Sequence, residues 1–192
     1  MVKIKFLLLI APFFLLFAAP GNSFAQRDSS ELTWFFRDYK WGMADQTGRE
    51  VVPPIYDYIS MLANGLTRVN IGSIYKEEIG VVGGKWGLID DYGRVVLTPK
   101  YEYLEVFVYG LARVNKGGVY DEEDMLTGGK WGMITTSGKV VIPAKYAYVE
   151  NPTPTGLVRV NIGGTYDYFG NVTGGRWKNK DVSRFLRGEG SR

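Results

Sequence analysis

Tryptophan recurs in this chain at one nearly constant spacing. The repeated tryptophans are 45, 45 and 46 residues apart, at Trp41, Trp86, Trp131 and Trp177. Around them, Gly83-Gly84-Lys85-Trp86-Gly87 returns as Gly128-Gly129-Lys130-Trp131-Gly132. Self-similarity at a period of this length is the signature of stacked units, each of which buries its apolar face against a neighbour. The chain is therefore expected to fold as an array of like units rather than around one central core.

Each copy contains the same order of strand and turn signals. A polar turn that ends in glycine follows the tryptophan, as in Asp91-Tyr92-Gly93, and glycine suits the positive φ of such a turn. β-Branched residues follow, as in Val95-Val96, and a third strand-like run covers residues 110–115. No stretch has the pattern of a long amphipathic helix. The pattern predicts an all-β protein.

We expect these ~45-residue β-hairpin repeats to form an open solenoid-like array. Propeller-like blades are the alternative, because units of this length also suit blades. Propellers typically need at least four blades. Only three copies are complete, since Lys178 replaces the glycine after the last tryptophan. The predicted segments are a signal peptide at 1–25, an N-terminal cap at 27–40, repeats at 41–85, 86–130 and 131–176, and a degenerate repeat or disordered tail at 177–192.

The N-terminal segment has the order of a secretory signal. Lys3 and Lys5 precede an apolar run from Phe6 to Ala19, and Ser23-Phe24-Ala25 is a small-residue cleavage site. The run is shorter than the ~20 residues of a membrane-spanning helix. We therefore expect a cleaved signal helix, no membrane span after cleavage, and a periplasmic, cell-surface or extracellular location. The chain has no cysteine, so its fold cannot depend on disulfides.

Three motifs occur together in the second copy and recur, with single-residue departures, in the first and third. They are Gly-Lys-Trp-Gly, then Gly-Arg-x-Val with a later Pro-x-Tyr, then Gly-Leu-x-Arg-Val. Together they resemble the WG repeat, also called the KWG repeat, of many bacterial proteins, over residues 40–177. The units here are longer than the compact form of that family by the segment before each glycine pair. The resemblance implies an exported or surface all-β module whose usual role is binding, and it implies no catalytic residues.

Residue types exclude most familiar active sites. The chain has neither histidine nor cysteine, so thiolate and imidazole catalysis, and zinc sites built from these ligands, are ruled out. Acidic residues cluster at Glu77-Glu78, Asp90-Asp91 and Asp121–Asp124, but a glycosidase needs two opposed carboxylates in a cleft. A calcium repeat would keep its ligands in every copy, and this chain does not. We expect no enzyme activity, no metal and no cofactor.

The tryptophans, their glycines and a recurring arginine are interpreted as structural. Each tryptophan is expected to fill the space between units, and each arginine to pair with carboxylates or carbonyls of the adjacent unit. Tryptophans stacking on glycans, and a row of arginines binding an anionic polymer, are the alternatives. The positions are Trp41, Trp86, Trp131, Gly42, Gly87, Gly132, Arg68, Arg113 and Arg159.

Tyrosine pairs are the candidate partner-binding residues. Tyrosines two apart share one face of an extended segment, and they would form a continuous stripe if that face points outward. The pairs are Tyr56 and Tyr58, Tyr101 and Tyr103, and Tyr146 and Tyr148. Basic residues concentrate in 176–192 rather than over the repeats, which does not favour nucleic acid as a partner.

The predicted function is therefore an exported non-catalytic repeat module. It would bind a protein or a cell-envelope polymer through an extended face of the repeats. The alternatives are a structural spacer with no specific ligand and, least favoured, a carboxylate-dependent enzyme that acts on glycans.

Overall fold

A computed structural model describes residues 32–62, 64–167 and 171–186. These residues form antiparallel sheets and one short 3-10 helix at Ser183–Phe185. The first sheet has β1 (Thr33–Arg37), β2 (Lys40–Ala44) and β3 (Glu50–Tyr56). The second has β4 (Tyr58–Met61), β5 (Leu66–Lys76), β6 (Gly80–Asp90) and β7 (Val95–Tyr101).

The third sheet has the same plan as the second. It consists of β8 (Tyr103–Leu104), β9 (Leu111–Tyr120), β10 (Leu126–Thr135) and β11 (Val140–Tyr146). The fourth has β12 (Tyr148–Val149), β13 (Leu157–Ile162) and β16 (Arg176–Asp181), and β14 (Thr165–Tyr166) with β15 (Val172–Thr173) forms a separate two-stranded ribbon.

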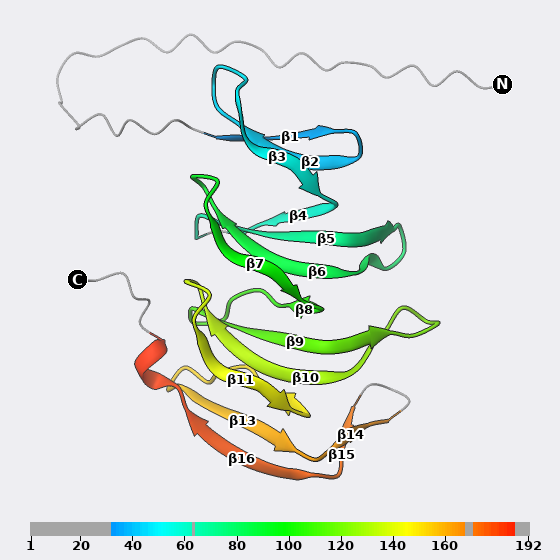
Figure 1. The fold of residues 1–192 in the computed structure, drawn as a ribbon. Coiled ribbons are helices and arrows are strands. Elements are labelled where there is room, and N and C mark those ends of the chain that lie inside the picture. The colour runs from blue at the N-terminus through cyan, green and yellow to red at the C-terminus, as the bar shows by residue number, and fades with distance from the viewer. Residues whose placement is uncertain (1–31, 63, 168–170, 187–192) are drawn as a thin grey trace.

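The sheets lie one above another in chain order, as a stack that does not close on itself (Figure 1). The expectation of an all-β chain of repeated antiparallel sheets is confirmed, and the described strands form no closed barrel. The predicted signal peptide, residues 1–25, lies outside the described residues, as do residues 27–31 of the predicted cap. The rest of that cap supplies β1, which pairs with β2.

The second and third sheets are each built from two successive sequence repeats. The boundary between the first two repeats, at Lys85 and Trp86, lies inside the continuous strand β6. β4, β5 and the part of β6 up to Lys85 therefore come from the first repeat, while the rest of β6, from Trp86, and all of β7 come from the second. The repeat seen in the sequence is out of phase with the sheet, so neighbouring repeats are joined by strand pairing as well as by side-chain packing.

The apolar core lies between the sheets. One cluster joins Trp86 and Leu88 of the second sheet to Leu104 and Val114 of the third. Equivalent clusters join the first sheet to the second and the third sheet to the fourth. Every pair of neighbouring sheets is thus held by its own core, as expected for a repeat protein.

The C-terminal segment closes the stack. We predicted a degenerate repeat or a disordered tail at 177–192, and disorder is wrong for residues 177–186. Strand β16 pairs with β13 along its length, and Val182 is buried in the core beneath the third sheet. Asn179 stands opposite Arg159, where the second and third sheets carry the fully buried Leu88 and Met133. This exposed polar residue on an outer face is typical of a capping repeat.

Candidate binding surface

The glycine that follows Trp41, Trp86 and Trp131 is required because the backbone of the neighbouring strand lies close to it. The pairing of β6 with β7 shifts register between Trp86 and Leu88, which brings the carbonyl oxygen of Leu97 over Gly87. A Cβ at Gly87 would lie 2.4 Å from that oxygen, and equivalent contacts occur at Gly42 and Gly132. Trp86 and Trp131 are buried between sheets. The structural interpretation of these positions therefore agrees with the structure.

The recurring arginines bridge neighbouring sheets. Arg113 lies 5.4 Å from the ring centroid of Trp131, and its Nη1 donates to the carbonyl oxygen of Val149 in the next sheet at 3.0 Å. Burial opposes its positive charge, but hydrogen bonds to Glu105 and Tyr148 outweigh burial and raise the pKa of Arg113. Arg68 makes the equivalent bond one sheet earlier, as expected.

Arg159 belongs to the last sheet and makes no such bridge. It lies over the ring of Trp177, 4.6 Å from the centroid, and pairs with Glu150 at 3.3 Å. Its side chain is half exposed, whereas that of Arg113 is 12% exposed. Arg68 and Arg113 are thus held by contacts within the protein. The three arginines do not form an exposed row that could bind an anionic polymer.

The tyrosine pairs do not form a stripe, and the prediction that both members share one face is wrong. The chain bends between them, so Tyr56 ends β3 of the first sheet and Tyr58 begins β4 of the second. Tyr56, Tyr101 and Tyr146 are buried in the core, and burial raises the pKa of Tyr56 and Tyr101. The second members, Tyr58, Tyr103 and Tyr148, are half-buried and lie edge-on to tryptophans.

A buried asparagine that was not among the predicted site residues bonds across each hairpin. Asn115 is fully buried; its Nδ2 donates to the carbonyl oxygen of Gly128 at 3.2 Å, and its Oδ1 accepts from Gly118 at 3.1 Å. A Cβ at Gly129 would lie 2.2 Å from that Oδ1. Asn70 and Asn161 make the same bond to the first glycine of each pair. The sequence signal that could have identified this asparagine is an Arg-Val-Asn motif at a constant distance before each Gly-Gly pair.

Beyond this asparagine, each hairpin continues as a projecting arm. The arms are residues 73–82, residues 118–127, and strands β14 and β15, and all three project from the same side of the stack (Figure 1). We call this side the arm edge. Lys76 of the first arm pairs with Asp124 of the second at 2.6 Å.

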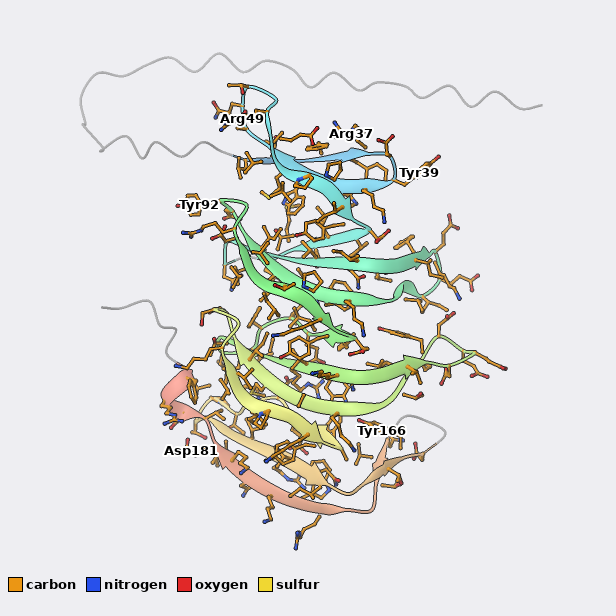
Figure 2. The ribbon with its side chains drawn as sticks, viewed as in Figure 1. Arg37, Tyr39, Arg49, Tyr92, Tyr166 and Asp181 are labelled. Carbon is orange, nitrogen blue, oxygen red and sulfur yellow. The ribbon has the colours of Figure 1, made fainter. Side chains whose placement is uncertain are left out.

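Exposed apolar side chains gather on the first two arms. Each is more than half exposed: Ile74, Tyr75, Ile79, Val119 and Met125. Tyr39, in the β1–β2 turn, projects on the same side, whereas Arg49 and Tyr92 mark the opposite side, the turn edge (Figure 2). A run of apolar side chains on the edge of a folded protein indicates an interaction surface.

A lysine and a carboxylate join the sheets at the base of the arm edge. Lys40 pairs with Asp57, whose Oδ2 accepts from the amide of Gly72 in the second sheet at 2.7 Å. Lys85 pairs with Glu102 in the same way one sheet later. Burial disfavours the Glu102 carboxylate, but the hydrogen bond from Lys85 and the amide of Gly117 outweigh burial and lower the pKa of Glu102.

The acidic clusters belong to turns. Asp90 accepts from the amides of Tyr92 and Arg94 at 3.0 and 2.9 Å, and Asp121 accepts from Met125 at 2.8 Å. Within the described residues, no group of three metal-ligating side chains is placed to hold an ion. No described helix has the length and hydropathy to cross a membrane.

Comparison with known proteins identifies the repeat. No curated protein matches the chain with significant similarity. The family described as WG containing repeat matches residues 41–73, 86–120 and 131–166, more than half of the chain. The first two matches end within the arms, whose tips lie outside them. The chain therefore belongs to the family of proteins with WG-containing repeats.

Proposed function

We propose that this protein is an exported, non-catalytic module that binds a partner protein along the arm edge. The observation that carries the proposal is the row of exposed apolar side chains on the two arms, exemplified by Ile74 and Val119. Protein interfaces are enriched in aromatic residues and methionine, and the arms also expose Tyr75 and Met125.

The family match supports the same surface. Its first two segments end at residues 73 and 120, so the remainder of each arm lies outside the matched repeat. Positions that differ between members of one repeat fold are suited to partner choice, because the fold does not depend on them. The arms thus combine exposed apolar side chains with a position outside the matched repeat.

A protein partner is favoured over a neutral glycan. Glycan stacking needs exposed aromatic faces; the first tyrosine of each pair is buried, and one face of the exposed Tyr75 is covered by Tyr58, which stacks on it. Export is proposed from the N-terminal sequence, and absence of catalysis from the missing histidine and cysteine.

The proposal is tested by affinity capture from a cell-envelope extract. The baits are the wild-type protein, an arm-edge variant with Ile74→Ser and Val119→Ser, and a turn-edge variant with Tyr92→Ser and Val95→Ser. All four side chains are more than half exposed, so the two variants are matched.

We expect a protein that the wild type and the turn-edge variant recover and the arm-edge variant loses. Equal recovery by all three baits would contradict the arm edge as the binding surface. Recovery of no protein by any bait would favour the spacer alternative, and turnover of glycan by the purified protein would overturn the non-catalytic proposal.

A further inference from the structure

Consecutive sheets are connected by one residue that follows a buried tyrosine, and we call this place a junction. The junction between the third and fourth sheets lacks the carboxylate that the first two junctions contain. Asp57, Glu102 and Ala147 follow the buried tyrosine in successive repeats. Their backbone amides donate to the carbonyl oxygens of Asn70, Asn115 and Asn161, at 2.9, 3.0 and 2.9 Å. The three residues are therefore held in the same way, and only the third carries no acid.

The lysine of the third junction is left without its partner. Lys130 immediately precedes Trp131, as Lys40 and Lys85 precede their tryptophans. Those two lysines pair with Asp57 and Glu102, whereas no carboxylate in the described part of the chain pairs with Lys130.

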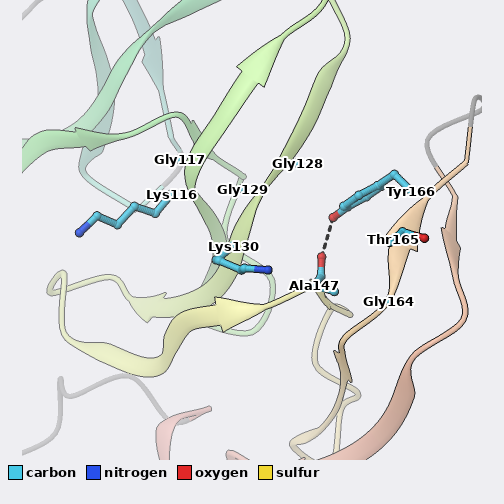
Figure 3. Close-up of a pocket in the computed structure, with 9 residues that line it drawn as sticks. All are labelled: Lys116, Gly117, Gly128, Gly129, Lys130, Ala147, Gly164, Thr165 and Tyr166. Atoms are coloured by element: carbon cyan, nitrogen blue, oxygen red, sulfur yellow. Dashed lines mark hydrogen bonds between the residues drawn. The ribbon is translucent and has the colours of Figure 1, made fainter.

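A pocket of about 580 Å³ lies at this junction, between the second arm and the β14–β15 ribbon. Its lining includes Lys130, Ala147, Gly164, Thr165 and Tyr166. Tyr166 donates to the carbonyl oxygen of Ala147 at 2.7 Å, and the Lys130 amine points toward Ala147 (Figure 3). Lys116 also lines the pocket, but its amine points away from Tyr166.

We propose that this pocket binds a single carboxylate side chain of the partner protein. The carboxylate takes the position that Asp57 and Glu102 occupy at the other junctions and pairs with Lys130. Gly163 is the equivalent of Gly72, whose amide donates to Asp57, and its φ of +78° is close to the +86° of Gly72; it adjoins Gly164 of the pocket lining, and we expect its amide to be the second donor. The assignment rests on the proposed function, because it names the chemical group that the same edge recognises.

The charges on the arm edge favour a peptide with an isolated acid. Glu77, Glu78, Glu122 and Glu123 are exposed at the tips of the arms. A polymer with a negative charge on every unit is repelled by these tips. An apolar segment that carries one carboxylate meets the apolar arms and places its acid at Lys130. The volume also lies in the range of small-ligand pockets, ~300–1,000 Å³, and exceeds the needs of a bare anion.

The probe copies the chain's own acidic segment. Binding of the capped peptide Tyr-Glu-Tyr, which reproduces Tyr101-Glu102-Tyr103, is measured by NMR titration of the full chain. The control peptide is capped Tyr-Gln-Tyr. Because a charge-assisted pair is lost, we expect the glutamine peptide to bind about tenfold more weakly.

Variants locate the site. Ala147→Glu places an internal carboxylate beside Lys130 and should abolish the preference for the glutamate peptide, while Ala147→Gln controls for added bulk. Lys130→Gln should remove the same preference, and Lys116→Gln, which removes one charge from the same pocket, should largely retain it. Glu102→Ala should open a second site beside Lys85 and raise the stoichiometry from one to two.

Equal affinity for the two peptides, or equal losses from Lys116→Gln and Lys130→Gln, would overturn the proposal. Stronger binding of oligogalacturonate than of the glutamate peptide would assign the pocket to an acidic glycan and would also overturn it. These measurements need no natural partner. A negative result therefore removes the carboxylate site without deciding the capture experiment, and the converse also holds.

Discussion

The guanidinium Nη1 of Arg68 donates a hydrogen bond of 2.9 Å to the carbonyl oxygen of Leu104 in the following sheet. The same guanidinium lies 5.3 Å from the ring centroid of Trp86. One side chain thus connects the tryptophan of its own sheet to the backbone of the next. This relationship is repeated by Arg113 and ends at Arg159, beyond which no described sheet follows.

Replacement of Arg113 by alanine should destabilise the stack more than replacement of Arg159. Arg113→Ala removes bonds to Val149 and Glu105 and leaves Glu105 without its cation, at a cost of about 2–3 kcal/mol. Arg159→Ala removes a half-exposed pair, at a cost of less than about 1 kcal/mol. Denaturant unfolding measures both losses, and equal values would contradict the bridging role.

Alanine substitutions at two adjacent glycines can distinguish the effect of backbone strain from that of a steric clash. Gly128 and Gly129 have φ of +66° and +69°, so alanine is strained at either position by about 1–2 kcal/mol. A Cβ at Gly128 meets nothing within 4 Å, whereas one at Gly129 lies 2.2 Å from Asn115 Oδ1. We expect Gly129→Ala to lower the melting temperature further than Gly128→Ala. Equal shifts would show that the asparagine contact does not restrict this position.

The turn at Asp45 should lose its stabilising effect in acid. A hydrogen bond from Thr47, with others from Arg49, lowers the pKa of Asp45 from 3.8 to about 2. A lowered pKa in the folded state stabilises the protein above the unfolded pKa, and this contribution is lost as the pH falls from 4 toward 2. The difference in melting temperature between wild type and Asp45→Asn should therefore shrink over that range. A constant difference would contradict this origin.

The C-terminal segment should contribute to stability through Val182. This side chain is 2% exposed in the core below the third sheet, so Val182→Ala should cost about 1–3 kcal/mol. Val95→Ala, at an exposed strand position, is the matched control. If the two variants have equal unfolding free energies, the segment does not cap the stack.

The sequence was sufficient for the features that recur locally. Trp86, Gly87 and the glycine turns could be identified because each copy repeats the same residues in the same register. The offset between sequence repeats and sheets could not be predicted, because nothing at Lys85 indicates that one strand runs through the repeat boundary. The tyrosine stripe failed because the rule of alternating faces assumes one continuous strand, and the chain bends after Tyr56.

The candidate pocket could not be predicted from the sequence, because its residues come from different strands. The sequence shows that Ala147 replaces the acid found at Asp57 and Glu102. It does not show that a lysine on another strand pairs with that acid, so the loss of an ion pair could not be predicted. Only the fold brings Lys130, Ala147 and Tyr166 together.

Binding at the arm edge is tested most directly by mapping the amides that respond to the Tyr-Glu-Tyr peptide. We expect chemical-shift changes concentrated at Gly128, Gly129, Gly163 and Gly164, at the base of the second arm and the ribbon. Changes concentrated in the turns at residues 45–48 and 90–93, on the opposite edge, would contradict it.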